Sequence, residues 1–160
     1  MSINIRQLEE KDNELLAELI RKVFREFKIN KPGTVYDDPT TNHLYELFRR
    51  EKSAYWVVEE NGKIWGGCGL FPTEGLPIGC AELVKFYLTK ESRGKGIGKL
   101  LLQIVINSAK EIGYTQLYLE SFPELVKAIS MYEKAGFNIT DTPLGNSGHH
   151  ACTIWMLREL

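Results

Sequence analysis

The sequence predicts a single mixed α/β domain (α+β) that spans residues 1–160. Two observations predict this class. Short apolar runs of strand length alternate with longer runs whose apolar residues recur at helical spacing, and Asn61-Gly62 joins two of the strand runs as a tight hairpin. The chain is long enough for one hydrophobic core, and no linker or internal repeat divides it.

The first part of the chain predicts one short strand and two helices. The strand covers residues 3–8, and Asp12 is a suitable N-cap for a helix that extends to about residue 27. After a loop rich in turn residues, Pro39 suits the first turn of a second helix that ends near Arg50. The apolar residues expected on the buried face of the first helix are Leu15, Leu16, Leu19, Ile20, Val23 and Phe27.

The rest of the chain predicts a hairpin followed by alternating strands and helices. Strands at residues 54–59 and 64–71 flank the Asn-Gly turn, and residues 80–88 form the next strand. A long helix at residues 96–112 ends at Gly113, with Ile97, Leu100, Leu101, Ile104, Val105 and Ile112 expected inside. The remaining elements are a strand at 115–121, a helix at 123–135 and two short strands at 137–140 and around 151–157.

Composition argues against several classes of protein. The net charge of −1 lacks the basic excess expected of a nucleic-acid-binding protein, and no apolar run is long enough to span a membrane. The N-terminus has no apolar signal-peptide segment. Cys68, Cys80 and Cys152 show neither a CxxC pair nor metal-ligand spacing, so we expect reduced structural thiols, no metal and a cytoplasmic protein.

The most informative motif is the run at residues 93–98, Arg-Gly-Lys-Gly-Ile-Gly, between the third long strand and the long helix. The first N–H groups of a helix have no intrahelical partner, and the helix dipole adds partial positive charge there. Glycines let the backbone approach a ligand closely, and Arg93, Lys95 and Lys99 supply countercharge. The run therefore predicts binding of a pyrophosphate; the alternative interpretation is a flexible strand-to-helix turn.

Two other phosphate motifs do not fit this run. A P-loop needs four residues between its glycines and a hydroxyl residue after its lysine, whereas three residues separate Gly94 from Gly98 and Leu100 follows Lys99. The dinucleotide fingerprint GxGxxG also fails, because the glycines are at every second position.

The run instead resembles the Gln/Arg-x-x-Gly-x-Gly/Ala signature of the GNAT superfamily of acyl-CoA-dependent N-acetyltransferases. Residues 82–88, Glu-Leu-Val-Lys-Phe-Tyr-Leu, are similar to the fourth strand of that family. Residues 128–137 are similar to its later motif, Ala-x-x-x-Tyr-Glu-x-x-Gly-Phe. The resemblance covers about residues 80–140. One departure is Leu125, where many members have an asparagine that contacts the pantetheine arm.

The resemblance implies a twisted, mixed and mostly antiparallel sheet flanked by helices, with acetyl-CoA bound between two strands that splay apart. Backbone amides of the glycine run would hold the pyrophosphate, and the strand backbone before it would pair with the pantetheine amides. The residues implied in cofactor binding are Phe86, Tyr87, Leu88, Arg93, Gly94, Lys95, Gly96, Ile97, Gly98 and Lys99.

Tyr132 and Glu82 are the candidate catalytic residues. The spacing of Tyr132 by itself favours core packing, whereas the resemblance implies that its phenol protonates the departing CoA thiolate. Glu82 lies in an apolar strand, where strict alternation places it on the face of Val84, Phe86 and Leu88 unless a bulge changes the register. Its two interpretations, a general base or the partner of a basic side chain, stay open.

The acceptor site is the least defined part of the sequence. The early loop with Tyr36, Asp37 and Asp38 and the late loop with His149 and His150 are candidate contacts to an acceptor. The sequence thus predicts transfer of an acetyl group from acetyl-CoA to a primary amine of a small molecule or peptide, by direct attack and without a covalent enzyme intermediate. The alternative is a non-catalytic acyl-CoA-binding or regulatory module of the same fold. The oligomeric state is left open, a homodimer included.

Overall fold

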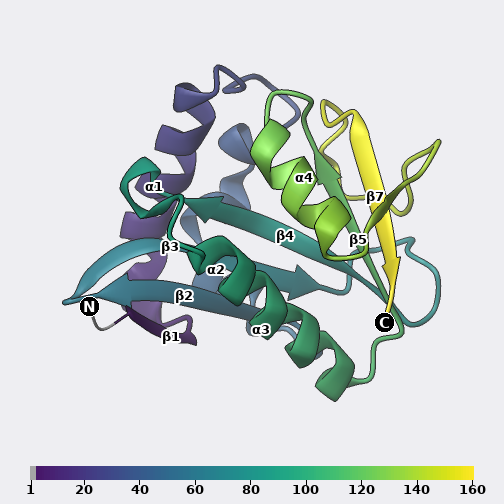
Figure 1. Cartoon of the computed structure of the whole chain (residues 1–160), viewed down its shortest axis with the longest axis horizontal. Helices are drawn as coiled ribbons and strands as arrows, with labels where there is room; N and C mark the ends of the chain where they lie inside the picture. Colours follow the sequence, from purple (N-terminus) through teal and green to yellow (C-terminus); the bar gives the residue numbers. More distant parts are fainter. Residues whose placement is uncertain (1–2) are drawn as a thin grey trace.

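The structure, a computed structural model, describes residues 3–160 and contains one sheet of seven strands in the order β1-β2-β3-β4-β5-β7-β6 (Figure 1). Neighbouring strands are antiparallel except for β4 and β5, which are parallel. The mixed, mostly antiparallel sheet predicted from the sequence is therefore confirmed. The strands are β1 (Ile3–Gln7), β2 (Ala54–Glu60), β3 (Lys63–Phe71), β4 (Cys80–Leu88), β5 (Gln116–Ser121), β6 (Asn138–Ile139) and β7 (Ile154–Glu159).

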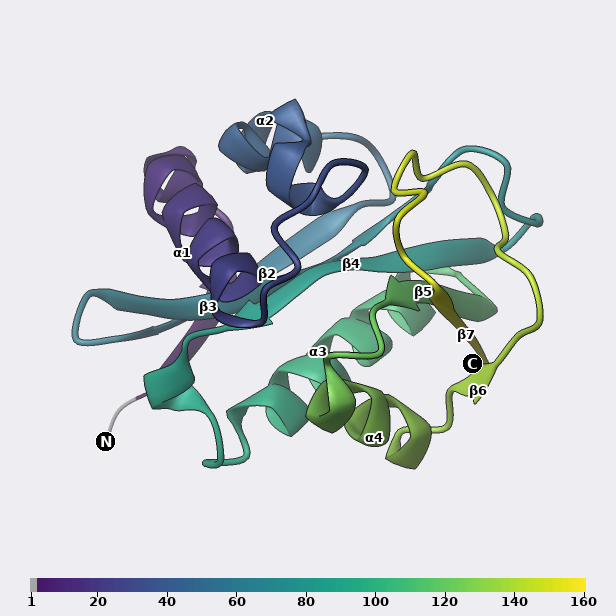
Figure 2. The same cartoon turned by 90° about the horizontal axis from the view of Figure 1, so that it is seen from above.

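Helices cover both faces of the sheet (Figure 2). One face carries α1 (Asn13–Glu26) and α2 (Leu44–Leu47), and the other carries α3 (Ile97–Ile112) and α4 (Val126–Lys134). Each face buries its own hydrophobic core. The core under α1 includes Leu16, Ile20, Phe24 and Tyr55, and the core under α3 includes Leu101, Val105, Leu119 and Met156.

The hairpin between β2 and β3 forms as predicted, because Asn61 and Gly62 both adopt positive φ angles of 52° and 79°. The second predicted helix is shorter and broken. Pro39–Asn42 forms a 3-10 turn, capped by the Asp38 carboxylate, which accepts a 2.9 Å hydrogen bond from the Thr40 N–H. The non-helical backbone of His43 (φ −133°, ψ 48°) then interrupts the helix before α2 begins.

The buried stripe of α3 is rotated by about one position from the predicted one. Leu100 is 52% exposed, and Ile104 is only half-buried. Leu102, Ile106 and Ala109 are buried instead, so this helix presents a broad face to the sheet. Leu15 of α1 is likewise exposed. The sequence therefore predicted the helices correctly, but some residues at the edges of their predicted buried faces are exposed.

Asp12 precedes α1 as predicted, but its side chain does not cap the helix. Its carboxylate is buried and pairs with the Arg6 guanidinium of β1 at 2.8 Å. Burial opposes the charged form, yet the hydrogen bond from Arg6 holds the pKa of this carboxyl below its usual range. The three cysteines are buried free thiols. Among residues 3–160, no helix is both long enough and apolar enough to cross a membrane.

Candidate active site

The sheet opens between its two parallel strands. β4 and β5 pair only over Cys80–Glu82 and Gln116–Tyr118, and they diverge beyond this point (Figure 1). The edge of β4 that faces β5 therefore lacks a strand partner from residue 83 onward.

A β-bulge in β4 shapes this gap. The β3–β4 register shifts between Gly67, opposite Tyr87, and Gly69, opposite Val84, so β4 contains one extra residue. Lys85 absorbs it with a left-handed φ of 51°. The buried Tyr55 hydroxyl donates a 2.9 Å hydrogen bond to the Lys85 carbonyl and so satisfies a backbone group that the bulge takes out of the ladder.

The bulge corrects the strict alternation considered for this strand. Val84 and Tyr87 pack in the core under α1, whereas Phe86 and Leu88 pack in the core under α3. Glu82 therefore shares its side of β4 with Val84 and, after the bulge, with Tyr87. The extra residue at the bulge is the reason, because it reverses the side chains that follow it.

The glycine run makes an exposed turn into α3. Gly94 and Gly96 have φ angles of 77° and 78°, a region that L-residues rarely adopt, and Gly96 is the N-cap of α3. The first α-helical hydrogen bond of this turn runs from the Leu100 N–H to the Gly96 carbonyl at 3.1 Å, so the preceding N–H groups have no acceptor within the helix. A Cβ added at Gly94 or Gly96 would contact nothing within 4 Å, which leaves this helix end open.

The side chains around this turn have different surroundings. Lys95 and Lys99 are exposed, whereas Ile97 is buried in the core, so only its backbone faces the turn. The Arg93 guanidinium does not extend over the turn. It donates hydrogen bonds of 3.1 and 2.8 Å to the Leu88 carbonyl and forms an ion pair with Glu26 of α1, with one N–O distance of 3.0 Å. Arg93 thus anchors the end of β4 to α1, whereas Lys95 and Lys99 are the exposed basic residues at the turn.

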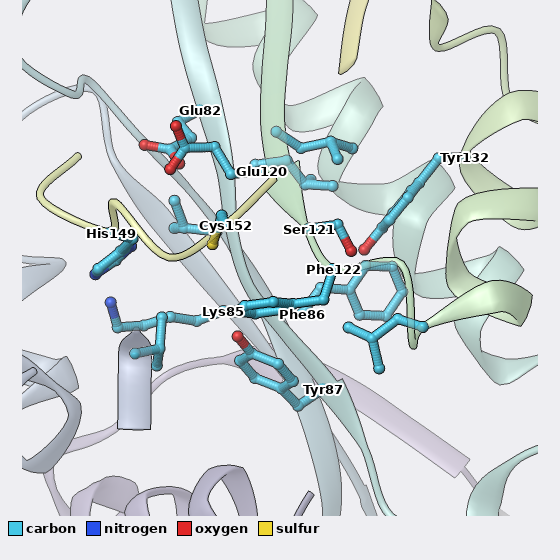
Figure 3. Close-up of a pocket in the computed structure, with 15 residues that line it drawn as sticks. Glu82, Lys85, Phe86, Tyr87, Glu120, Ser121, Phe122, Tyr132, His149 and Cys152 are labelled. Atoms are coloured by element: carbon cyan, nitrogen blue, oxygen red, sulfur yellow. The ribbon is translucent and has the colours of Figure 1, made fainter. Parts of the chain in front are cut away.

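A pocket occupies the gap between β4 and β5 (Figure 3). Its walls come from both strands, from α4, and from the early and late loops. The residues that line it are Val35, Glu82, Leu83, Val84, Lys85, Phe86, Tyr87, Leu119, Glu120, Ser121, Phe122, Leu125, Tyr132, His149 and Cys152. The structure thus brings Glu82, Tyr132, His149 and the β4 backbone to one pocket.

Glu82 is a buried carboxyl group with a strongly shifted pKa. Its side chain is 3% exposed and accepts a 2.6 Å hydrogen bond from the Thr73 hydroxyl. Burial raises the pKa of Glu82 from 4.5 to about 7, and the charge of Glu120 adds to this, while the hydrogen bond, His149 and Lys85 oppose it. A carboxyl with this pKa can exchange protons near neutral pH, which a general base requires.

Tyr132 packs in the core and also lines the pocket. The side chain is 7% exposed and packs edge-on against Phe86 and Phe137, with ring centroids 6.1 and 5.9 Å away. Its hydroxyl nevertheless points toward the pocket (Figure 3). Burial raises the pKa of Tyr132 above its usual value, so the phenol stays protonated near neutral pH. It is thus a core residue whose polar end reaches the pocket.

Of the two loops expected at the acceptor site, only part reaches the pocket. The late loop contributes His149, whose Nε2 lies 2.8 Å from Oδ2 of Asp38 in the early loop. Tyr36 is turned toward α1, where its hydroxyl accepts a 3.4 Å hydrogen bond from Arg25 and its carbonyl accepts one from Arg21. The early loop therefore lines the pocket with Val35 in place of Tyr36, because the 3-10 turn at Val35–Asp37 directs the two side chains apart.

The other two loop candidates have structural contacts. The Asp37 carboxylate accepts hydrogen bonds of 3.3 Å from the N–H groups of Gly33 and Thr34, and so closes its own turn. His150 is exposed, and its ring packs over Gly33. Neither of them lines the pocket.

Sequence reasoning missed three polar residues of the pocket: Lys85, Glu120 and Ser121. The Glu120 carboxylate accepts hydrogen bonds from the hydroxyls of Tyr118, at 2.8 Å, and Ser147, at 2.5 Å. The signal that could have found Lys85 was a charged residue inside an apolar strand, the same signal that singled out Glu82. Among residues 3–160, no group of three or more His, Cys, Asp or Glu residues is arranged to hold a metal ion.

Comparison with known proteins identifies the family. Residues 15–137 match the model described as the acetyltransferase (GNAT) family. The chain belongs to this family. The resemblance predicted from the motifs is therefore confirmed, and GNAT membership makes the protein an acetyl-CoA-dependent acyltransferase.

Individual GNAT relatives cover nearly the whole chain. The uncharacterized N-acetyltransferase YjgM of Escherichia coli (strain K12) is 38% identical over 157 residues, which are 98% of this chain and 94% of YjgM. A GNAT-family acetyltransferase from Staphylococcus aureus Mu50 superimposes with a TM-score of 0.88 at 26% identity and 99% coverage of both chains. The PaiA N-acetyltransferase from Thermoplasma acidophilum, solved in complex with coenzyme A, has the same fold, with a TM-score of 0.74 at 23% identity and full coverage of both chains.

Proposed function

We propose that this protein transfers an acetyl group from acetyl-CoA to a primary amine of a small molecule or peptide, by direct attack of the amine on the thioester. The observation that carries the proposal is the position of Glu82. Its carboxyl group, with a pKa of about 7, lines the same pocket as the Tyr132 hydroxyl, at the point where β4 and β5 separate. A proton acceptor and a proton donor thus face one cleft.

The glycine turn and the open edge of β4 support the cofactor assignment. N–H groups without intrahelical partners at the start of α3 suit the pyrophosphate, with Lys95 and Lys99 exposed beside them. The β4 edge beyond Glu82 suits the pantetheine amides, which would extend the sheet as an added strand. The CoA complex of PaiA, a protein of the same fold, is consistent with this arrangement.

The proton balance follows from the two side chains. An amine that arrives protonated first releases one proton to water. As the neutral nitrogen then bonds to the acetyl carbon and the C–S bond breaks, Glu82 accepts a second proton from the nitrogen and Tyr132 donates one to the sulfur. The products are the amide and the CoA thiol, and exchange with water returns the proton from Glu82 to Tyr132. A lysine-like amine needs about 4.6 kcal/mol to lose its proton at pH 7, and an α-amine needs about 1 kcal/mol. The rate enhancement that a general base can provide therefore depends on the acceptor.

The decisive experiment measures CoA thiol release from acetyl-CoA with a panel of amino acids, polyamines, aminoglycosides, arylalkylamines and peptide N-termini. The proposal expects release that depends on both acetyl-CoA and an amine, together with an acetylated product detected by mass spectrometry. Acetyl-CoA binding in calorimetry without release for any amine or protein acceptor would favour a non-catalytic acyl-CoA-binding module. Faster CoA release with a longer acyl-CoA would show that the acyl donor is not acetyl-CoA, while the proposed transfer to an amine would still hold.

A further inference from the structure

Lys85 is a buried amine that the described chain leaves without a partner. It lies at the bulge of β4, its side chain is 7% exposed, and it lines the pocket. Within residues 3–160, its Nζ forms no ion pair and no hydrogen bond with another side chain. A lysine in such a place is costly, because burial opposes its charged form.

The carboxylates around Lys85 are held by other groups. Asp38 lies against His149 at 2.8 Å and also accepts a 2.7 Å hydrogen bond from the Thr40 hydroxyl. Glu82 is bound by Thr73, and Glu120 by two hydroxyl groups. Asp38 and Glu82 favour the charged form of Lys85 without contacting it. On balance burial lowers the pKa of Lys85, and the pocket therefore contains a lysine amine that forms no direct contact with any of these carboxylates.

The bulge directs this amine into the pocket. The Tyr55 hydroxyl holds the Lys85 carbonyl at the left-handed backbone position that the extra residue creates. Figure 3 shows Lys85 Nζ beside the His149 ring, and the carboxylates of Glu82 and Glu120 at another end of the same pocket. Lys85 and His149 thus lie at one end of the pocket, where the Asp38 carboxylate contacts His149, and the two glutamates lie at another.

Resting on the proposed function, we infer that the acceptor is a small zwitterion, an amino acid or a short aminocarboxylic acid, whose carboxylate binds Lys85 while its amine faces Glu82. A ligand carboxylate supplies hydrogen-bond acceptors for this amine and a negative charge that favours its protonated form. The amine of the same molecule then lies toward the group that accepts its proton. An acceptor without a carboxylate would leave the Lys85 amine without a charged partner in the complex.

The test compares matched acceptors. Wild-type protein is assayed for CoA release with glycine, β-alanine, γ-aminobutyrate, leucine and phenylalanine, each against its own carboxamide, with rates expressed per concentration of free amine. The inference expects kcat/KM to be about ten- to a hundredfold higher for the acid form of at least one pair, because the amide loses a charged hydrogen bond. Equal use of acids and amides would overturn the inference and leave the proposed acetyl transfer standing. No release with any amine would count against the proposed function itself.

Variants then assign the preference to Lys85. In Lys85→Met, the ratio of kcat/KM for the acid to kcat/KM for the amide should fall by about ten- to a hundredfold, mainly through KM for the acid. Lys110→Met, at an exposed position of α3, is the matched control and should keep the wild-type preference. If Lys85 had only a structural role, Lys85→Met would lower kcat/KM for the acid and for the amide equally. That result would refute the assignment. If Lys85→Met fails to fold, Lys85→Gln keeps a polar end and is expected to lose the same preference.

Discussion

Replacing Glu82 by glutamine should change activity and stability in opposite directions. In the folded protein, burial raises the pKa of this carboxyl from 4.5 to about 7. The group therefore binds its proton more tightly in the folded state, so its contribution to stability is complete below about pH 4.5 and is lost as the pH rises to 7. Above pH 7, wild-type protein holds a buried charge, whereas the side-chain amide of the variant is neutral.

The size of the effect follows from the pKa difference. The difference between 4.5 and about 7 is about 2.5 pH units, which corresponds to about 3 kcal/mol at about 1.4 kcal/mol per unit. Glu82→Gln should accordingly raise the free energy of unfolding at pH 8 by up to about 3 kcal/mol. In a chain of this length, that increase raises Tm by about 6 to 12 °C, and the gain should vanish near pH 4.

The activity of Glu82→Gln should fall, because an amide cannot accept the proton of the amine. With an alkylamine acceptor, a general base contributes about 100-fold or more to the rate. Wild-type kcat/KM should rise as the pH increases through about 7, where Glu82 loses its proton, and this limb should be missing in the variant.

Urea unfolding and CoA-release assays from pH 4 to 9 measure both effects in the same preparations. Glu111→Gln removes an exposed carboxylate from α3 and serves as the control, with no change expected in either assay. A variant that is less stable than wild type at pH 8, or one that keeps the pH profile, would refute the argument that Glu82 is a buried base.

Three further variants test other parts of the site. Tyr132→Phe should lower kcat about tenfold or more with little change in acetyl-CoA affinity, and unchanged turnover would limit this residue to core packing. Gly96→Asp should weaken acetyl-CoA binding in calorimetry more than Gly96→Asn, which has the same size and the same left-handed strain without the charge; equal affinities would place the pyrophosphate elsewhere. Tyr55→Phe should cost about 1 to 3 kcal/mol in urea unfolding, since the Lys85 carbonyl loses its partner at the bulge, and an unaltered midpoint would show that water replaces the hydroxyl.

Local signals in the sequence were sufficient for the elements that position the site. The Asn61-Gly62 turn, the strand Cys80–Leu88 and the glycine N-cap of α3 are where the residue types require them. These features depend on backbone preferences of a few neighbouring residues, above all the positive φ angles that glycine tolerates. The second helix is the exception, because the backbone of His43 leaves the helical region and divides the predicted helix.

The contacts within the site were beyond the reach of sequence reasoning. The Glu82 carboxylate accepts a hydrogen bond from the Thr73 hydroxyl, and the Glu120 carboxylate accepts one from Ser147, 27 residues away. His149 meets Asp38 across 111 positions of the chain. The bulge at Lys85 depends on a tyrosine 30 residues earlier. No local preference encodes such pairs, because each one forms only when distant segments pack together.

The sequence by itself determined the family, the glycine turn and the two residue types that can move protons, since motif spacing and backbone conformation are local properties. Only the tertiary structure decided how those residues behave. Burial between two diverging strands raises the pKa of Glu82, and the bulge turns Lys85 into the same pocket. Desolvation and charge interactions act through space, so they are set by which segments the fold brings together.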